Sequence, residues 1–243
     1  MTTEIQTPTT PATRPTAASR APRDVRRTRR LLAAALLPVP AVAVAVLRLV
    51  WPAFSAPDTA GTLSAIAKHP AAQEAVIWLG MVMALTMVPA VLAAARLARR
   101  RRPTLAMIAA GVNLIAYLLA APLNAGDLMA QVAARPEYDH ARLVPYLDAV
   151  NAHPASSVGS GAFVLGHIIG MILLGAALWR IIPRWASIAL IVSQPLHFVA
   201  FVVLGLQPLD GFAWALTAAG FVACSVAVLR TPDSEWDLAP DRS

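Results

Sequence analysis

The sequence predicts an all-α fold, a polytopic membrane helix bundle with six transmembrane helices. Hydrophobic residues make up 58% of the 243 residues and charged residues 14%, whereas soluble domains average about 45–50% and about 25%. Six apolar stretches are each long enough to cross a bilayer, which takes about 20 residues. Arginines gather at the start of the chain and at every second connection between these stretches, a pattern typical of membrane proteins.

The six predicted spans have few large side chains. Aromatic residues make up only 6% of the chain, so alanine, leucine, valine and isoleucine supply most of the apolar mass. Small side chains allow membrane helices to approach closely. Only "LQPLDG" separates the last two spans, which predicts a tight turn there. The spans lie at residues 31–52, 73–97, 104–124, 158–180, 184–206 and 209–229.

The basic residues predict the orientation and the partners. Sixteen of the twenty lie before the first span, between the second and third, between the fourth and fifth, or after the sixth. An excess of lysine and arginine marks cytoplasmic loops, so we expect both termini in the cytoplasm and the chain in the cell membrane. The lipid bilayer is the expected partner. Nucleic acid is not, because these arginines adjoin the spans and lack interleaved aromatic residues.

The chain divides into a membrane domain and two tails. Residues 1–30 are rich in threonine, proline and alanine without apolar periodicity, which predicts a disordered cytoplasmic tail. Residues 31–229 form the six-span domain, and residues 230–243 form a cytoplasmic C-terminal tail. The stretch "RRTRRLLAAALL" also has features of a twin-arginine signal. We favour a first span that is not cleaved off, because this apolar stretch is long enough to cross the membrane and five more spans follow it.

A phrase repeated 84 residues apart indicates an internal duplication. "LSAIAKHPAA" at 63–72 recurs as "LDAVNAHPAS" at 147–156, and an arginine follows each histidine by 27 residues. The predicted units are residues 62–124 and 146–206. Each has two spans, so both enter the membrane the same way up and should be related by an axis along the membrane normal. We expect the first and sixth spans to flank this four-helix centre.

The outer surface carries His69 and His153, each followed by proline. Proline is favoured at the first helical position, so both histidines should lie at helix entry points, as interfacial residues or as a symmetric titrating or metal-binding pair. The connection 125–157 also holds acidic residues and His140. It lacks the spacing that presents two metal ligands on one helix face, so we expect a solvated polar loop.

Polar residues inside the spans are costly and are therefore functional candidates. His167, His197 and Asn113 lie at one predicted depth, near the middle of the membrane. Tyr117 lies on the same stripe as Asn113, and proline-flanked Ser193 and Gln194 precede His197. One interpretation is hydrogen-bonded helix packing, with no cofactor. The alternative is a haem or copper site that uses His167 and His197. In either case we expect the two rings to face each other in the bundle interior.

One ion pair is predicted near the outer surface. Arg48 and Glu74 each lie about one helical turn below it, on consecutive spans. The alternative is that both side chains extend separately to the interface.

The phrase L-x-A-[IV]-x-x-H-P-A and the turn "AALWRIIPRWA" carry a resemblance to uncharacterised multi-pass membrane proteins of high-GC bacteria. The resemblance implies a membrane location and supplies no catalytic residues. The chain also lacks a Gly-rich phosphate loop, a nucleophile elbow and paired carboxylates, so an enzyme is disfavoured. The leading hypothesis is a transporter, accessory subunit or sensor; the alternatives are a haem- or copper-binding redox protein and a structural partner-binding protein.

Overall fold

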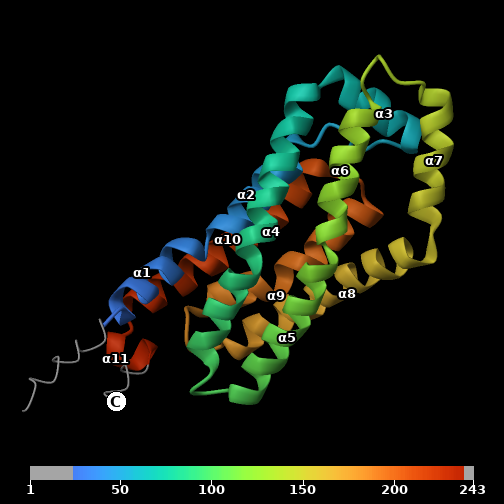
Figure 1. Cartoon of the computed structure of the whole chain (residues 1–243). Coiled ribbons are helices and arrows are strands. Elements are labelled where there is room, and N and C mark those ends of the chain that lie inside the picture. The colour runs from blue at the N-terminus through green and yellow to red at the C-terminus, as the bar shows by residue number, and fades with distance from the viewer. Residues whose placement is uncertain (1–23, 238–243) are drawn as a thin grey trace, which may run out of the picture.

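The computed structural model describes residues 24–237, and the described chain is built of helices (Figure 1). Proline occupies the first helical position of α4, α5 and α8, where its missing N–H costs no hydrogen bond. The helices are α1 (Arg26–Leu36), α2 (Val39–Val50), α3 (Thr59–Lys68), α4 (Pro70–Ala98), α5 (Pro103–Leu119), α6 (Ala121–Ala133), α7 (His140–Ala152), α8 (Pro154–Ala177), α9 (Arg184–Phe198), the π-helix η1 (Val199–Val203), α10 (Gln207–Arg230) and α11 (Asp233–Trp236).

Within residues 24–237, six helical segments are long and apolar enough to cross a membrane, so the predicted fold class is confirmed. The first segment begins at Arg26, inside the predicted tail 1–30, of which residues 1–23 lie outside the described part. The third continues past a break at Ala120 and ends at Ala133 rather than 124. The segments are Arg26–Val50, Pro70–Ala98, Pro103–Ala133, Pro154–Ala177, Arg184–Val203 and Gln207–Arg230.

The spanning segments close into a ring in chain order. α2 packs on α4, α4 on α5, α5 on α8, α8 on α9, α9 on α10, and α10 returns to α2. The predicted arrangement, in which the first and sixth spans flank a four-helix centre, is therefore wrong. The first and last spans instead contact each other and complete the ring.

Small residues bring α5 and α8 together. A Cβ atom added at Gly166 would lie 2.8 Å from the Cβ of Ala116, and one added at Gly170 would lie 2.5 Å from Nδ2 of Asn113. Both distances are too short for a real contact, so this helix pair requires glycine at both positions. The close approach has the form expected for small-residue packing between membrane helices.

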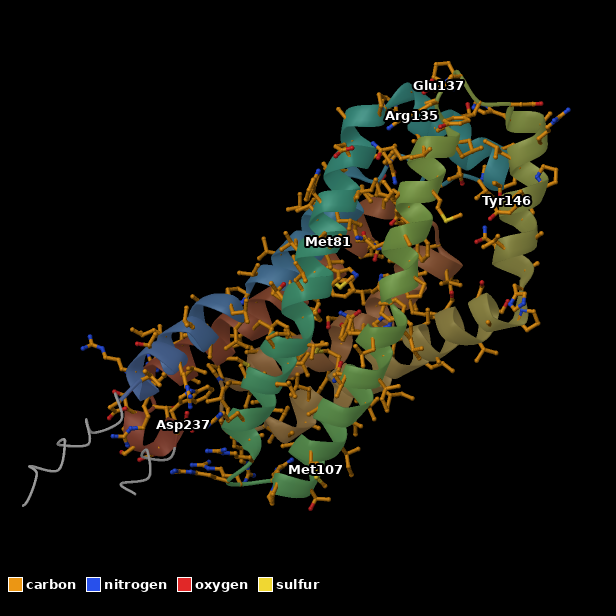
Figure 2. All side chains as sticks on the ribbon, viewed as in Figure 1. Met81, Met107, Arg135, Glu137, Tyr146 and Asp237 are labelled. Carbon is orange, nitrogen blue, oxygen red and sulfur yellow. The ribbon has the colours of Figure 1, made fainter. Side chains whose placement is uncertain are left out.

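Two short helices cover one end of the bundle, which we call the outer end and which Figure 2 marks with Arg135 and Glu137. Asp58 and Asp139 cap α3 and α7 by accepting hydrogen bonds from the amides of Gly61 and Ala141. Thr59 Oγ1 donates to Asp148 Oδ1 at 2.5 Å and joins the two helices. The prediction of a solvated loop over 125–157 is therefore wrong, because α6 continues into it and α7 occupies its centre.

The opposite end, which we call the arginine-rich end, holds α11 and the labelled Asp237 (Figure 2). Arg30 pairs with Asp233 at 2.6 Å, and Arg96 pairs with Asp237 at 2.7 Å. The predicted tail 230–243 is thus partly helical and tied to the bundle through its described part. Residues 238–243 lie outside the described chain.

The order of elements repeats where the sequence phrase repeats. α3, α4 and α5 follow one another as α7, α8 and α9 do. An exposed histidine stands at each junction, His69 between α3 and α4 and His153 between α7 and α8. A rotation about the membrane normal that superposes the units 62–124 and 146–206 stays a prediction.

Candidate functional site

A buried ion pair joins the first and last spans near the outer end. Arg48 Nε on α2 lies 2.7 Å from Asp210 Oδ2 on α10, and the carboxylate of Asp210 is fully buried. Its other oxygen accepts a hydrogen bond from Nδ1 of His197 on α9. A carboxylate in an apolar interior is costly without partners, and here a cation and an imidazole both contact it.

Aromatic rings surround the Arg48 guanidinium. Its central carbon lies 4.3 Å from the ring centroid of Phe201, 5.2 Å from Trp51 and 5.9 Å from Phe54. A cation over aromatic faces is stabilised further when water is excluded. Gln207 fixes the end of α2 beside these rings, since its Nε2 lies 2.9–3.2 Å from the backbone carbonyls of Arg48, Leu49 and Trp51.

The two membrane histidines lie next to each other, with ring centroids 5.7 Å apart. His167 stacks on Phe163 at 4.6 Å and lies 6.3 Å from Trp214. A carbonyl only accepts hydrogen bonds, so the 2.8 Å contact between Nδ1 of His167 and the Phe163 carbonyl places the ring proton on Nδ1. Nε2 is then a buried acceptor without a hydrogen-bond partner in the described chain.

A cavity of about 480 Å³ opens beside this network. Arg48, Asp127 and His197 contribute charged or titratable groups to its wall, and α3 and α7 contribute residues at the outer end. Asp127 lies on α6 and Arg48 on α2, so two elements supply the opposite charges of this wall. The aromatic wall consists of Trp51, Tyr117, Phe163, Phe198, Phe201 and Trp214.

Two polar atoms of the aromatic wall also lack partners. The hydroxyl of Tyr117 and Nε1–H of Trp214 are buried and make no hydrogen bond within residues 24–237, like Nε2 of His167. Buried polar groups are nearly always satisfied by protein or by ordered water. Both residues line a cavity that is predominantly apolar and has a few polar groups, the usual composition of a ligand site.

The structure separates the predicted polar cluster into two parts. Tyr117 lies with the histidines, 6.4 Å from His167 between ring centroids. The others are buried but bond elsewhere: Asn113 donates to the Ala109 carbonyl, Ser193 to the Leu190 carbonyl, and Gln194 to Thr217 Oγ1 on α10. These three stabilise helices rather than line the cavity.

The predicted ion pair between Arg48 and Glu74 is wrong. Arg48 pairs with Asp210, while Glu74 accepts hydrogen bonds from Trp78 at 2.7 Å and Gln131 at 2.9 Å. The error follows from the ring closure, which places α10 beside α2 at this depth. At the outer surface, the ring of His153 caps α8 by accepting from the Ala155 amide at 3.2 Å, and His69 is exposed between two helices.

Sequence reasoning missed Asp210, Asp127 and Trp214. Asp210 lies in the stretch "LQPLDG", which is predicted to be a turn. A signal for the first turn of a helix is present there, because Asp210 follows Pro208 by two residues and precedes an apolar stretch. Asp127 falls in the predicted outer loop, because the predicted third span ends too early. Trp214 lies one helical turn after Asp210, so both side chains share a face of α10.

Six helical segments that are long and apolar enough to cross a membrane close into a ring within residues 24–237, which defines the chain as an integral membrane protein of helix-bundle type. The chain belongs to the family of the domain of unknown function DUF4386, whose model matches residues 31–229. That range covers nearly all of the six spanning segments. Neither curated proteins nor solved structures gave a match.

Proposed function

We propose that this protein binds a small, largely apolar molecule with one polar group in the cavity near the outer end, as a transporter or sensor of that molecule. The cavity carries the proposal. Its volume of about 480 Å³ falls within the roughly 300–1,000 Å³ typical of small-molecule sites. Tyr117 and Trp214 line it, and each carries a buried hydrogen-bond donor without a partner within residues 24–237.

The charges of the site disfavour an anionic group on the ligand. The charges of Arg48 and Asp210 offset each other at 2.7 Å, so Arg48 is not left to neutralise an anion, and the other acidic residue of the wall is Asp127. Two donors in an apolar wall suit a carbonyl, ether or hydroxyl oxygen. An unpaired donor is costly to bury, so an oxygen acceptor would contribute more here than on an exposed surface.

A fluorescent probe of this chemistry tests the proposal. Prodan is small and largely apolar and carries one carbonyl oxygen as an acceptor, and its emission is stronger in an apolar site than in water. We expect saturable enhancement with the purified protein. Ser160→Trp should abolish it, because Ser160 lines the cavity, whereas Ser157→Trp, on an exposed position of the same helix, should leave it unchanged. Equal signals from both variants would assign the probe to the detergent and overturn the proposal.

The adjacent histidines support a second candidate, binding of haem or copper by His167 and His197. The favouring observation is the 5.7 Å separation of rings whose Nδ1 atoms are already hydrogen-bonded, which leaves the Nε2 atoms for a ligand. Among residues 24–237, no three His, Cys, Asp or Glu side chains gather as a metal site, so this candidate uses two histidines alone. Purified protein with neither a Soret band nor stoichiometric copper would remove it.

We also propose that the arginine-rich end faces the cytoplasm and that the chain resides in the cell membrane. The support is the excess of arginine at the helix ends there. A reporter active only in the cytoplasm should work when attached at residue 100 and be silent at residue 140. The opposite result would reverse the orientation.

A further inference from the structure

A groove of about 580 Å³ opens at the arginine-rich end, far from the outer cavity. It lies between the end of α4, the turn from α8 to α9, the last turns of α10, and α11. Its polar wall has six arginines and one acidic residue, Glu235. The arginines are Arg96, Arg99, Arg100, Arg101, Arg180 and Arg230.

Much of this positive charge is not neutralised by the described chain. Arg96 and Arg100 form ion pairs with Asp237 and Glu235. Arg101 donates to the carbonyl of Arg180 at 3.3 Å, and a carbonyl does not cancel a charge. Arg101, Arg180 and Arg230 form no ion pair within residues 24–237. The groove therefore keeps an excess of guanidinium groups, which suits an anion with several oxygens.

The backbone at Arg180 has a conformation that is uncommon for a residue with a side chain. Arg180 has φ of 69°, in the left-handed region that favours glycine. An arginine there carries a conformational cost that glycine would avoid, and such cost is found where a side chain serves a site. The tight turn at Leu178–Ile182 brings this arginine to the rim of the groove.

The other wall is apolar and continues onto the membrane-facing surface. Val222 and Val226 of α10 line the groove and are 47% and 39% exposed, and Trp185 of α9 is 59% exposed. Tryptophan is enriched where a helix meets the headgroup region. One side of the groove thus suits a hydrocarbon chain and the other suits an anion.

We propose that this groove binds one anionic phospholipid from the adjoining leaflet. The phosphate contacts the guanidinium groups of Arg180 and Arg230, and an acyl chain lies along Val222 and Val226. Basic pockets between membrane helices recognise anionic headgroups in this way. A soluble phosphate compound would use the arginines but not the apolar wall, so the joint composition of the groove favours a lipid.

Native mass spectrometry of the full chain in detergent tests the proposal, with phosphatidylglycerol and phosphatidylcholine added in turn. We expect one phosphatidylglycerol to bind in preference to phosphatidylcholine. The double variant with Arg180→Gln and Arg230→Gln should bind phosphatidylglycerol about 25-fold more weakly, because each arginine beside an anionic lipid contributes about fivefold to the affinity. Arg27→Gln with Arg142→Gln removes the same charge outside the groove and should change binding less than twofold. Equal losses in the two double variants would overturn the proposal.

Two further measurements distinguish a bound lipid from a bound soluble anion. Val226→Trp fills the apolar wall without changing charge and should also reduce phosphatidylglycerol binding, which keeps the test open if the arginine variant does not fold. Glycerol phosphate, the soluble part of the headgroup, should not displace the lipid at equal concentration. Displacement, or full binding by Val226→Trp, would show that the groove selects a soluble anion and overturn the proposal.

Discussion

Removing the charge of Asp210 should destabilise the bundle strongly. Asp210→Asn keeps the size of the side chain and an oxygen that accepts from Nδ1 of His197, but leaves the Arg48 guanidinium without its counter-ion. The Asp210 carboxylate is fully buried and the Arg48 side chain is 13% exposed. Breaking a buried pair by removing one partner costs about 3–5 kcal/mol, so the unfolding free energy should fall by that amount.

The change can be measured by thermal unfolding of purified protein in detergent. For a chain of this length 1 kcal/mol shifts the midpoint by roughly 2–4 °C, so Asp210→Asn should lower it by roughly 6–20 °C. The matched control is Asp139→Asn, which removes the carboxylate of the exposed pair with Arg142, at 3.3 Å. Exposed pairs contribute about 0–1 kcal/mol, and asparagine still caps α7, so this midpoint should move by less than roughly 4 °C.

A double variant separates the pair from its surroundings. Arg48→Met with Asp210→Asn removes both charges and puts an unbranched apolar chain among the rings of Trp51, Phe54 and Phe201. Replacing a whole buried pair is often neutral, so the double variant should be more stable than Asp210→Asn. If Arg48→Met and Asp210→Asn each lower the unfolding free energy by less than about 1 kcal/mol, or if their effects add in the double variant, the ion pair does not hold α2 to α10.

Three other perturbations test the packing of α5 on α8, the unpartnered Nε2 of His167, and the contact between α3 and α7. Gly170→Ala should destabilise the bundle by about 1–3 kcal/mol, because the new Cβ meets Nδ2 of Asn113 at 2.5 Å. The control Gly161→Ala has open space around its Cβ and should be neutral or stabilising in the same unfolding assay. His167→Phe removes a buried acceptor without a partner in the described chain and should leave the unfolding midpoint unchanged or higher. A large loss of stability would show that Nε2 is satisfied. Thr59→Cys with Asp148→Cys replaces two side chains that are in hydrogen-bond contact between α3 and α7. The disulfide formed on oxidation should slow entry of the probe into the cavity compared with the reduced form. Equal rates would show that α3 and α7 do not control access.

Most of the fold could be predicted because its signals are local. These signals are the length of an apolar stretch, a proline at its start and arginines at its end. The six spans lie within a few residues of their predicted limits, except at the start of the first span and the end of the third. The prediction of the outer loop fails for a local reason as well. Pro145, Arg142 and Asp148 interrupt the apolar pattern of α7, so its periodicity is weak, and its start depends on the cap at Asp139.

The candidate site could be predicted only in part, because its central contact depends on how the ring closes. The cost of polar groups in a membrane is enough to select His167 and His197, and they do lie together. Their carboxylate partner could not be found in this way, because Asp210 stands beside Pro208 at the start of a helix and looks like a turn residue. No local pattern relates it to Arg48.

The contacts between the first and last spans explain why Arg48 and Asp210 meet. At the arginine-rich end, Arg30 pairs with Asp233 and Ser225 Oγ donates to the Ala34 carbonyl at 2.6 Å, which holds α1 beside the last turns of α10. At the outer end the ion pair holds α2 beside the first turn of α10, where Gln207 also binds the end of α2. Because the first and last spans are fixed to each other at both ends, the paired Arg48 is held in the wall of the cavity, and α3 and α7 line its outer side.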